Sequence, residues 1–461
     1  MIERLVIFGA AGDLTSRYLL PALARLREED RLPGGFALDA VSQEDLSTDE
    51  FLARVEGPLE RHAGGTSEGA RRAVLEAITY HQADATDPES IAPILRPDGN
   101  PIIVYLALPP AIFHPVVEAI IECGVGGESR IVVEKPHGVD LESTRSLNEL
   151  LHQSFPEDSV FRIDHFLGHQ TVQNLLGLRF GNRLFEPIWN CNHVESVEIR
   201  FDETLALEGR AGYYDRTGAL KDMLQNHLLQ LLCFVAMEPP LGYNPRDLRD
   251  KKLELLRAVR TLSRREIEDH TIRARYTAGR TDDREVPSYL DEENVDPERD
   301  TETFAQMALS VDNWRWAGTS FILRSGKALA ENRQEVVIRF REIPFSMFRD
   351  GGVPRQNTLR LTIEPDRMSL GLNLNGADDP FELEPASLDL ELAPQRLPAY
   401  ARLLLDLLHG DATLSIRADE AEESWRIVEP VLDAWRDDVV PMRTYEAGSE
   451  FEPETNHPPS R

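Results

Sequence analysis

Two short stretches of the sequence bring together side chains that can bind or transfer protons. The first, residues 162–169, reads Arg-Ile-Asp-His-Phe-Leu-Gly-His and holds four ionisable side chains. Within it Asp164 precedes His165, and a carboxylate beside an imidazole can orient or move a proton, because the two groups titrate on either side of neutral pH. The second, residues 221–230, places His227 at the head of an apolar helix. An Asp-His pair alone is more often a helix cap beside a surface histidine, so the second stretch is what favours a chemical site.

The N-terminal part of the chain must position the first stretch, and its pattern predicts a Rossmann domain over residues 1–165. Strand-like runs at 5–8, 36–41, 102–108 and 131–134 alternate with helical patterns at 111–123 and 141–151. This alternation is typical of a doubly wound parallel α/β sheet. The first run leads into Gly9-Ala10-Ala11-Gly12-Asp13-Leu14 and then a helix. That context favours a pyrophosphate site at the helix N-terminus, although a tight turn with a packed glycine is the alternative.

The residues at the ends of two predicted strands indicate which ligands bind. An acidic side chain after the second strand bonds the ribose of NAD, whereas a basic one binds the 2′-phosphate of NADP. The chain has Ser42-Gln43-Glu44-Asp45 there and no Arg or Lys, which favours NAD. Lys135 follows the strand at 131–134, where ligands of such sheets lie. Because only five of the 50 basic residues are lysines, a lysine at this point indicates a need for a compact ammonium.

The second part of the chain predicts a larger α+β domain over residues 166–461. Alternating runs at 195–201, 335–340 and 359–363 indicate half-buried antiparallel strands, and amphipathic helices are expected at 226–235 and 400–408. Residues 282–299 are polar and are expected to form an exposed loop. Residues 451–461 are expected to form a frayed tail.

Composition excludes several classes of function. The net charge of −30 argues against nucleic acid and anionic membranes, because both require a basic footprint. No apolar run approaches the roughly twenty residues that cross a bilayer and no signal peptide is evident, so a cytoplasmic protein is expected. Cys123, Cys191 and Cys233 lie in apolar surroundings and predict buried free thiols. The excess of Asp and Glu over Lys also suits a halophilic source.

Six motifs stand in the order and spacing of the glucose-6-phosphate dehydrogenases, and the chain resembles that family over essentially its whole length. They are residues 9–14, 134–136, 162–168, 182–190, 222–230 and 321–329, and the similarity continues through 445–449. The resemblance implies a Rossmann domain before an α+β domain that builds a homodimer or homotetramer. It also implies oxidation of C1 of glucose 6-phosphate to 6-phosphoglucono-δ-lactone in the pentose phosphate pathway, with hydride transfer to NADP or NAD.

The resemblance assigns roles to individual residues. His227 would be the general base toward the C1 hydroxyl, and Asp164 would orient it and stabilise the imidazolium. Glu203 and Asp222 would accept hydrogen bonds from sugar hydroxyls, Lys135 would lie between sugar and cofactor, and His165, His169 and Lys327 would line the phosphate end. The cofactor-binding residues would be Gly9, Ala11, Gly12, Asp13, Leu14, Gln43 and Lys135. No metal is expected, since the oxidation needs none and no His or Cys spacing resembles a ligand set.

Several positions depart from the family pattern. Phe166 and His169 stand where the family has Tyr and Lys, Tyr18 where it has a second basic residue, and Gln43 where it has the Arg that reads a 2′-phosphate. His137 stands where phenylalanine is common and could return a donor. A charge-assisted hydrogen bond contributes roughly 1.5–3 kcal/mol, so losing the lysine would lower phosphate affinity about ten- to a hundredfold unless His169 is protonated.

Two alternatives therefore stay open. Phe166 and His169 motivate a dehydrogenase of an unphosphorylated or differently substituted aldose. A non-catalytic homologue that binds sugar phosphate or a partner enzyme is the other, and the presence of both Asp164 and His227 argues against it.

Overall fold

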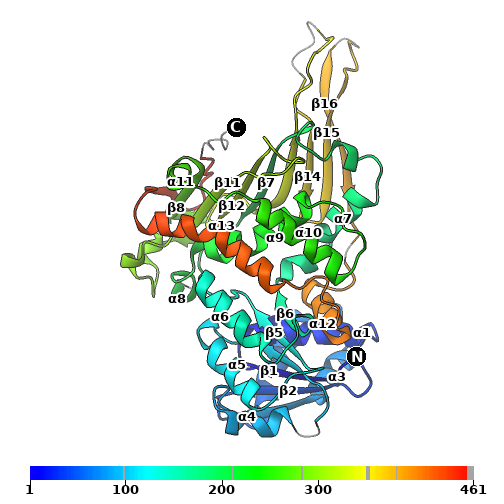
Figure 1. Ribbon diagram of the computed structural model, residues 1–461, viewed down its shortest axis with the longest axis vertical. Helices are drawn as coiled ribbons and strands as arrows, with labels where there is room; N and C mark the ends of the chain where they lie inside the picture. Colours follow the sequence, from blue (N-terminus) through cyan, green and yellow to red (C-terminus); the bar gives the residue numbers. More distant parts are fainter. Residues whose placement is uncertain are drawn as a thin grey trace. The chain divides into compact units, whose positions relative to one another are not determined.

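The chain is divided into two compact units. The structure, a computed structural model, describes residues 1–96, 99–209, 211–281, 284–348, 354–379, 382–393 and 395–453. Unit 1 comprises residues 1–169, 240–250 and 395–422, and unit 2 comprises residues 170–239, 251–394 and 423–461. Each unit is built on its own large sheet (Figure 1). None of the helices in the described part is long and apolar enough to cross a membrane.

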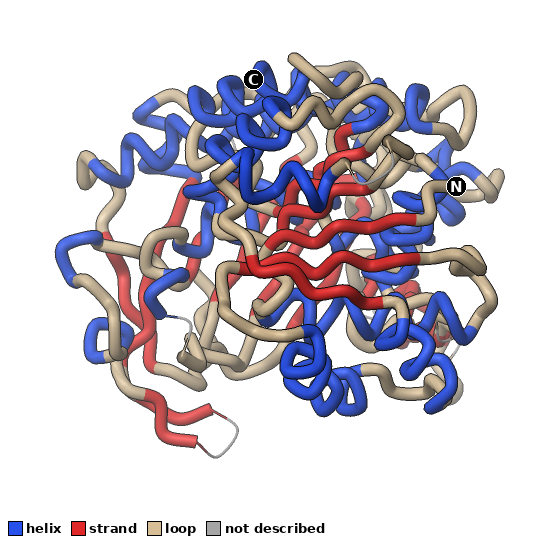
Figure 2. The backbone as a smooth tube through the Cα atoms, turned by 90° about the horizontal axis from the view of Figure 1, so that it is seen from below, coloured by secondary structure: helices blue, strands red, loops and turns tan. Residues whose placement is uncertain are grey.

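Unit 1 contains a six-stranded parallel sheet in the order β3-β2-β1-β4-β5-β6. Its strands are β1 (Arg4–Phe8), β2 (Ala37–Ser42), β3 (Ile78–Gln82), β4 (Ile103–Leu106), β5 (Arg130–Glu134) and β6 (Val160–Ile163). Helices lie on both sides of these strands (Figure 2). Every residue of β4 is buried, as expected for a parallel strand that is covered on both faces. The predicted doubly wound Rossmann sheet is therefore confirmed.

The helices of unit 1 include the predicted ones after the glycine loop, at 111–123 and at 141–151, and three more, α2 to α4, that were not predicted. They are α1 (Leu20–Glu28) preceded by the π-helical turn η1 (Thr15–Leu19), α2 (Thr48–His62), α3 (Glu68–Glu76), α4 (Pro88–Leu95), α5 (Phe113–Glu122), α6 (Leu141–His152) and α12 (Ala399–His409), with short 3₁₀ turns η2 (Pro110–Ile112), η3 (Glu157–Ser159) and η4 (His165–Gly168). Their boundaries have local causes. Ser47 and Glu50 form a capping box at the start of α2, and Asp140 with Ser143 forms one at the start of α6.

The helix α12 belongs to unit 1 and not to the second part of the chain, where the sequence pattern suggested it. The Ile2 amide donates to the Leu408 carbonyl at 3.2 Å, and Arg130 Nη1 donates to the Leu407 carbonyl at 2.6 Å. Residues more than 270 positions apart in the sequence make the second bond. The compact unit thus extends beyond the continuous segment 1–165.

Unit 2 contains a nine-stranded sheet in the order β16-β15-β14-β13-β7-β12-β11-β8-β17. The strands are β7 (Val194–Asp202), β8 (Thr271–Thr277), β11 (Phe304–Leu309), β12 (Ser320–Gly326), β13 (Arg333–Phe340), β14 (Thr358–Thr362), β15 (Arg367–Asn375), β16 (Leu383–Glu391) and β17 (Met442–Glu446). The pairs β7/β12 and β8/β17 are parallel, and the others are antiparallel. The mainly antiparallel α+β fold is therefore confirmed.

The remaining elements of unit 2 are mostly helical. They are α7 (Gln170–Phe180), η5 (Glu186–Ile188), α8 (Ala211–Tyr214), the π-helical segment η6 (Leu220–Leu228), α9 (Leu229–Ala236), α11 (Arg264–His270), η7 (Tyr289–Asp291) and η8 (Pro297–Arg299), with a small hairpin of β9 (Gly279–Thr281) and β10 (Arg284–Val286). The helices α10 (Pro245–Ala258) and α13 (Ala418–Arg436) each contribute residues to both units.

The alternation in residues 195–201 does not mark a half-buried strand. β7 is central, and its charged residues Glu198, Arg200 and Asp202 are buried, whereas Glu195 near its start is exposed. They tolerate burial because they are paired: Arg200 Nε donates to Glu198 Oε1 at 3.0 Å, and Arg324 Nη2 lies 2.7 Å from Asp202 Oδ2. A ladder of ion pairs, and not a solvent-exposed face, explains the pattern.

Three smaller expectations are only partly confirmed. Residues 284–299 are mostly exposed, as expected, but they contain β10 and two 3₁₀ turns. The buried Tyr289 hydroxyl donates to Asp215 at 2.6 Å, and residues 282 and 283 lie outside the described part. Cys191 is partly exposed, although Cys123 and Cys233 are buried and all three are free thiols. The start of the expected tail is packed, because the Phe451 ring stacks on Tyr445 with centroids 5.1 Å apart. Residues 454–461 lie outside the described part.

Candidate active site

The glycine loop of unit 1 has the backbone that a dinucleotide phosphate requires. Gly9 has φ of +82°, and a Cβ placed on it would lie 2.1 Å from the Ala107 carbonyl oxygen. The amides of Gly9 and Ala10 both donate to the Val41 carbonyl, at 2.9 and 3.0 Å, so β2 holds the loop in place. The helix begins directly afterwards at residue 13, and the first amides of a helix have no partner within it. The residues predicted to bind the cofactor at this loop are Gly9, Ala11, Gly12, Asp13 and Leu14, and they form this turn and the first helical residues.

The loop after β2, which contains Gln43, differs from the sequence-based expectation. Gln43 is exposed there. Although Ser42–Asp45 contains no basic residue, Arg54 of α2 forms an ion pair with Glu44. This pairing could not be predicted from the sequence, because Arg54 lies in a helix whose orientation depends on packing. The only available signal was the position of Arg54 in the second turn of a helix that follows the loop directly.

Lys135 follows β5 directly, and the carboxyl group of Glu134, the last residue of this strand, lies next to it. Glu134 is buried, and the Tyr105 hydroxyl of β4 donates to its Oε1 at 2.5 Å. Burial raises the pKa of Glu134 to about 7, against the opposing effects of the Tyr105 hydrogen bond and of Lys135. Lys135 itself is partly buried. The group next to this lysine therefore titrates near neutral pH.

Asp164 closes β6 and caps the next turn. It is 1% exposed, and its Oδ1 accepts a hydrogen bond at 2.9 Å from the Phe166 amide at the start of η4. One carboxylate oxygen is thereby used to fix the turn, and the side chain is held rigidly in a buried position. Arg162, the first ionisable residue of the stretch 162–169, has a structural role. Its guanidinium is buried and donates to Asn148 and Glu157.

An aromatic cluster surrounds the two histidines of the same turn. His165 stacks on Tyr400 of α12 with ring centroids 5.5 Å apart and planes 12° from parallel. Tyr400 in turn packs against Tyr18, with centroids 5.2 Å apart. The rings of His165 and His169 have centroids 6.3 Å apart. Tyr400 could not be recognised as a neighbour from the sequence, because more than 230 residues separate it from His165 in the chain.

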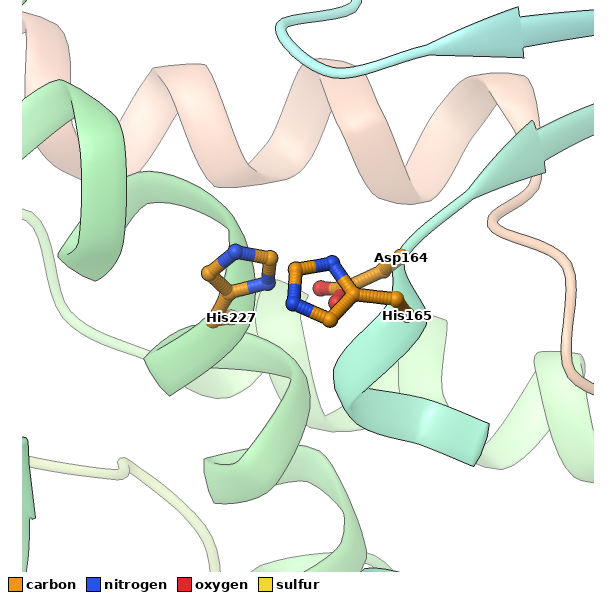
Figure 3. A group of neighbouring side chains, drawn as sticks. All are labelled: Asp164, His165 and His227. Carbon is orange, nitrogen blue, oxygen red and sulfur yellow. The ribbon is translucent and has the colours of Figure 1, made fainter. Parts of the chain in front are cut away.

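His227 lies in unit 2, within the π-helical segment η6. It is fully buried, and its backbone amide donates to Asn226 Oδ1 at 2.6 Å. The helix begins at Leu220 and continues into α9, so His227 lies in a helix interior and not at a helix start. π-helical segments are rare and frequently occur at functional sites. Figure 3 shows His227 on this helix, and Asp164 and His165 on the turn that follows β6.

Glu203, Lys327 and Asp222 are the other predicted site residues of unit 2. Lys327 Nζ donates to Glu203 Oε2 at 2.6 Å and lies 5.4 Å from the centroid of the Tyr214 ring. Burial raises the pKa of Tyr214, and the carboxylates of Glu302, Asp222 and Glu203 raise it further. The structure therefore pairs Glu203 directly with Lys327, a pairing that spacing in the sequence did not reveal. Asp222 is half-buried on η6.

The turn that carries Lys327 is held by its neighbours. The Lys327 amide donates to the Thr303 carbonyl at 3.0 Å, and the Tyr445 hydroxyl donates to the Lys327 carbonyl at 2.6 Å. Ala328, the next residue, has φ of +51°, a conformation that non-glycine residues rarely adopt. These contacts fix the backbone from which the ammonium extends.

The parallel sheet and its glycine loop place the chain in the class of nicotinamide dinucleotide-binding proteins. The family described as "Glucose-6-phosphate dehydrogenase, NAD binding domain" matches residues 6–174, and "Glucose-6-phosphate dehydrogenase, C-terminal domain" matches residues 176–457. The chain belongs to the glucose-6-phosphate dehydrogenase family.

Individual relatives agree with this membership. The chain is 40% identical over 469 residues to glucose-6-phosphate 1-dehydrogenase of Treponema pallidum, covering 96% of this chain and 91% of that protein. It is 38% identical over 468 residues to the Zymomonas mobilis enzyme of the same name, covering 97% and 95%. A solved structure of the Mycobacterium avium glucose-6-phosphate 1-dehydrogenase superposes with a TM-score of 0.86 at 34% identity, covering 97% of this chain and 94% of that one. A glucose-6-phosphate dehydrogenase in complex with glucose 6-phosphate superposes with a TM-score of 0.88 at 32% identity, covering 97% and 95%.

Proposed function

We propose that this protein oxidises C1 of glucose 6-phosphate to 6-phosphoglucono-δ-lactone with a nicotinamide dinucleotide. One observation carries the proposal: within a family match that covers both units, the chain keeps a buried carboxylate at Asp164 and a buried imidazole at His227. Burying an ionisable group costs free energy, and a homologue that only bound the sugar would need neither of these two buried groups. Their presence therefore supports catalysis.

The proposed chemistry involves residues from both units. His227 accepts the proton of the C1 hydroxyl, and Asp164 orients the imidazole and stabilises its charged form. A bound NAD or NADP supplies the acceptor for the hydride that leaves C1. The glycine loop belongs to unit 1, and His227 belongs to unit 2. Lys135, directly after β5, contacts both sugar and cofactor in this proposal.

The remaining site residues bind the substrate. Glu203 and Asp222 accept hydrogen bonds from sugar hydroxyls, and Lys327, already paired with Glu203 at 2.6 Å, orients that carboxylate and faces the phosphate end. His165 and His169 supply the other donors for the phosphate. The Gln43 side chain carries no charge to bind a 2′-phosphate, so NAD is the favoured cofactor.

A homodimer, or a homotetramer built from it, follows from the outer strands of unit 2. β16 is mostly exposed, and it carries the exposed apolar side chains Leu388 and Leu390. Leu374 of β15 is exposed farther along the same face, opposite Glu384, and the partly exposed Leu370 and Leu372 lie between. Contiguous exposed apolar side chains on a broad sheet mark a protein interface. Together with the family relationship, these strands support a dimer.

The test separates binding from chemistry. We expect His227→Asn to lower kcat by at least about a hundredfold, because a positioned general base contributes roughly that much or more. The dissociation constant for glucose 6-phosphate, measured by calorimetry, should change less than about twofold, since only the proton acceptor is removed. His114→Asn, an exposed histidine of α5, is the matched control. Turnover at the wild-type level in His227→Asn would end the assigned role.

A second function, oxidation of an unphosphorylated or differently substituted aldose, is favoured by one observation. The predicted phosphate end of unit 1 is lined by the rings of His165, Phe166, His169 and Tyr400. The turn that carries the first three of these residues contains no lysine. The ratio of kcat/KM for glucose 6-phosphate to that for glucose decides between the two. A ratio of at least about a hundred supports the phosphorylated sugar, because one charge-assisted bond contributes roughly 1.5–3 kcal/mol, and a ratio near one supports the alternative.

A further inference from the structure

We infer that Glu44 and Arg54 form a paired selector that makes unit 1 reject the 2′-phosphate of NADP. The inference rests on the proposed function only in assuming that a nicotinamide dinucleotide binds at the glycine loop. Glu44 would accept hydrogen bonds from the ribose hydroxyls of NAD. It would also hold Arg54 of α2 away from a phosphate; among the described residues this is the one basic side chain that forms an ion pair with the loop.

The geometry of the loop supports this role. Glu44 follows β2, the strand whose end meets the ribose in this fold. Its backbone is fixed on both sides, because its amide donates to Ser42 Oγ at 3.2 Å and its carbonyl accepts from the Tyr80 hydroxyl at 2.6 Å. Arg54 Nη1 donates to Glu44 Oε2. The carboxylate is thus presented from a rigid backbone, and the guanidinium is directed to it.

The local charge also opposes a phosphate. Glu44 and Asp45 are both acidic and exposed, and Asp84, which bonds the Gln43 side chain, adds a third carboxylate. Arg54 cancels only one of these charges. A phosphate monoester adds about −1.5 to −2 charges at pH 7, so its entry would place like charges next to each other.

The pair is nevertheless weak enough to be separated. Both side chains are 48% exposed, and ion pairs in such surroundings contribute little, since water screens them. If the Glu44 charge is removed, Arg54 becomes available as a planar donor pair that suits a phosphate. The arginine needed for NADP is therefore already present, and the neighbouring glutamate determines that it is not used.

The test measures binding apart from turnover. Dissociation constants for NADH and NADPH are measured by fluorescence, and those for 5′-AMP and 2′,5′-ADP by calorimetry, in the wild type, Glu44→Gln, Arg54→Gln and the double variant. We expect Glu44→Gln to lower the NADPH/NADH ratio of dissociation constants at least about tenfold, as for the gain of one charge-assisted bond and the loss of one repulsion. The double variant should lose most of this gain. Glu60→Gln, an exposed glutamate of α2, removes the same charge farther along the helix and should leave the ratio unchanged.

Two results would overturn the inference. If the ratio in Glu44→Gln stays within about twofold of the wild type, Glu44 does not select the cofactor. If the gain persists in the double variant, Arg54 is not the group that receives the phosphate. Neither result depends on oxidation of a sugar: a protein that bound NADH well but did not oxidise glucose 6-phosphate would contradict the proposed function and leave this test intact.

Discussion

Replacement of Glu134 by glutamine should change how the stability of unit 1 depends on pH. The carboxyl group is buried beside Lys135, and its pKa is raised to about 7, first by burial. In the unfolded chain the same group titrates near its ordinary value of 4.5. Between these two values the native state holds a proton that the unfolded state has released.

The sign and size of the effect follow by linkage. The native state binds more protons than the unfolded state in this window, so stability falls as pH rises from about 4.5 to about 7 and then levels off. Each pH unit within the window costs about 1.4 kcal/mol, and the full window costs about 3 kcal/mol. Glutamine keeps an acceptor for the Tyr105 hydroxyl but cannot titrate. The variant should therefore lose about 2 kcal/mol less than the wild type between pH 5.5 and 8.

Urea unfolding from pH 5.5 to 8 provides the assay, since the chain stays above its isoelectric point of about 4.8 there. All five tryptophans belong to unit 2, so their fluorescence reports unit 2 alone while far-ultraviolet circular dichroism reports both units. The difference between variant and wild type should appear only in the dichroism. Comparing the variant with the wild type also cancels the pH dependence that other groups contribute. One such group is Asp406 of unit 1, whose pKa is raised to about 6 by burial. Parallel pH profiles for wild type and Glu134→Gln would refute the reasoning, and the exposed Glu128→Gln is the matched control.

Two further predictions concern ligand binding. Gly9→Ala should weaken NADH binding at least about tenfold, because a Cβ would lie 2.1 Å from the Ala107 carbonyl and alanine tolerates positive φ poorly. Gly34→Ala, whose Cβ would meet nothing within 4 Å, should bind NADH normally, and normal binding by the Gly9 variant would show that the loop does not hold the dinucleotide. His169→Lys should lower the KM for glucose 6-phosphate about tenfold and leave that for glucose unchanged, since it returns a permanent charge. An unchanged KM for both sugars would mean that residue 169 does not face the phosphate.

The Rossmann sheet could be predicted from the sequence because its determinants are local. β4 is a continuous apolar run, β1 is one after Arg4, and helices begin at their own start signals, as at Ser47 and Asp140. β3 and β6 were not predicted, because polar or charged residues interrupt their apolar pattern. The glycine loop was equally clear, since Gly9 is the first residue after a buried strand. Such features depend on neighbours in the chain, and sequence patterns record them directly.

The partners of the site residues could not be predicted, because tertiary packing determines them. Tyr400 stacks on His165 only because α12 returns to unit 1 near the end of the chain. Arg54 meets Glu44 through the orientation of α2, and Lys327 meets Glu203 because β7 and β12 are parallel neighbours. Spacing in the sequence gives the residue types for these contacts but not which residues pair.

The buried charges of β7 explain both the alternating sequence pattern of this strand and the position of the residues that follow it. Arg200 and Asp202 alternate with apolar residues because they form ion pairs inside the sheet, and Arg324 of β12 pairs with Asp202 at 2.7 Å. Glu452 adds bonds to both arginines at 2.8 Å, one to each. Removing one member of such a network leaves a buried charge without its partner, which is strongly unfavourable. The network therefore fixes the register of β7 against β12 at the ends of these strands. Glu203 and Lys327 are the residues that immediately follow those ends. The buried charges that made a central strand resemble a half-exposed one therefore also hold in place the pair that we propose to bind the substrate.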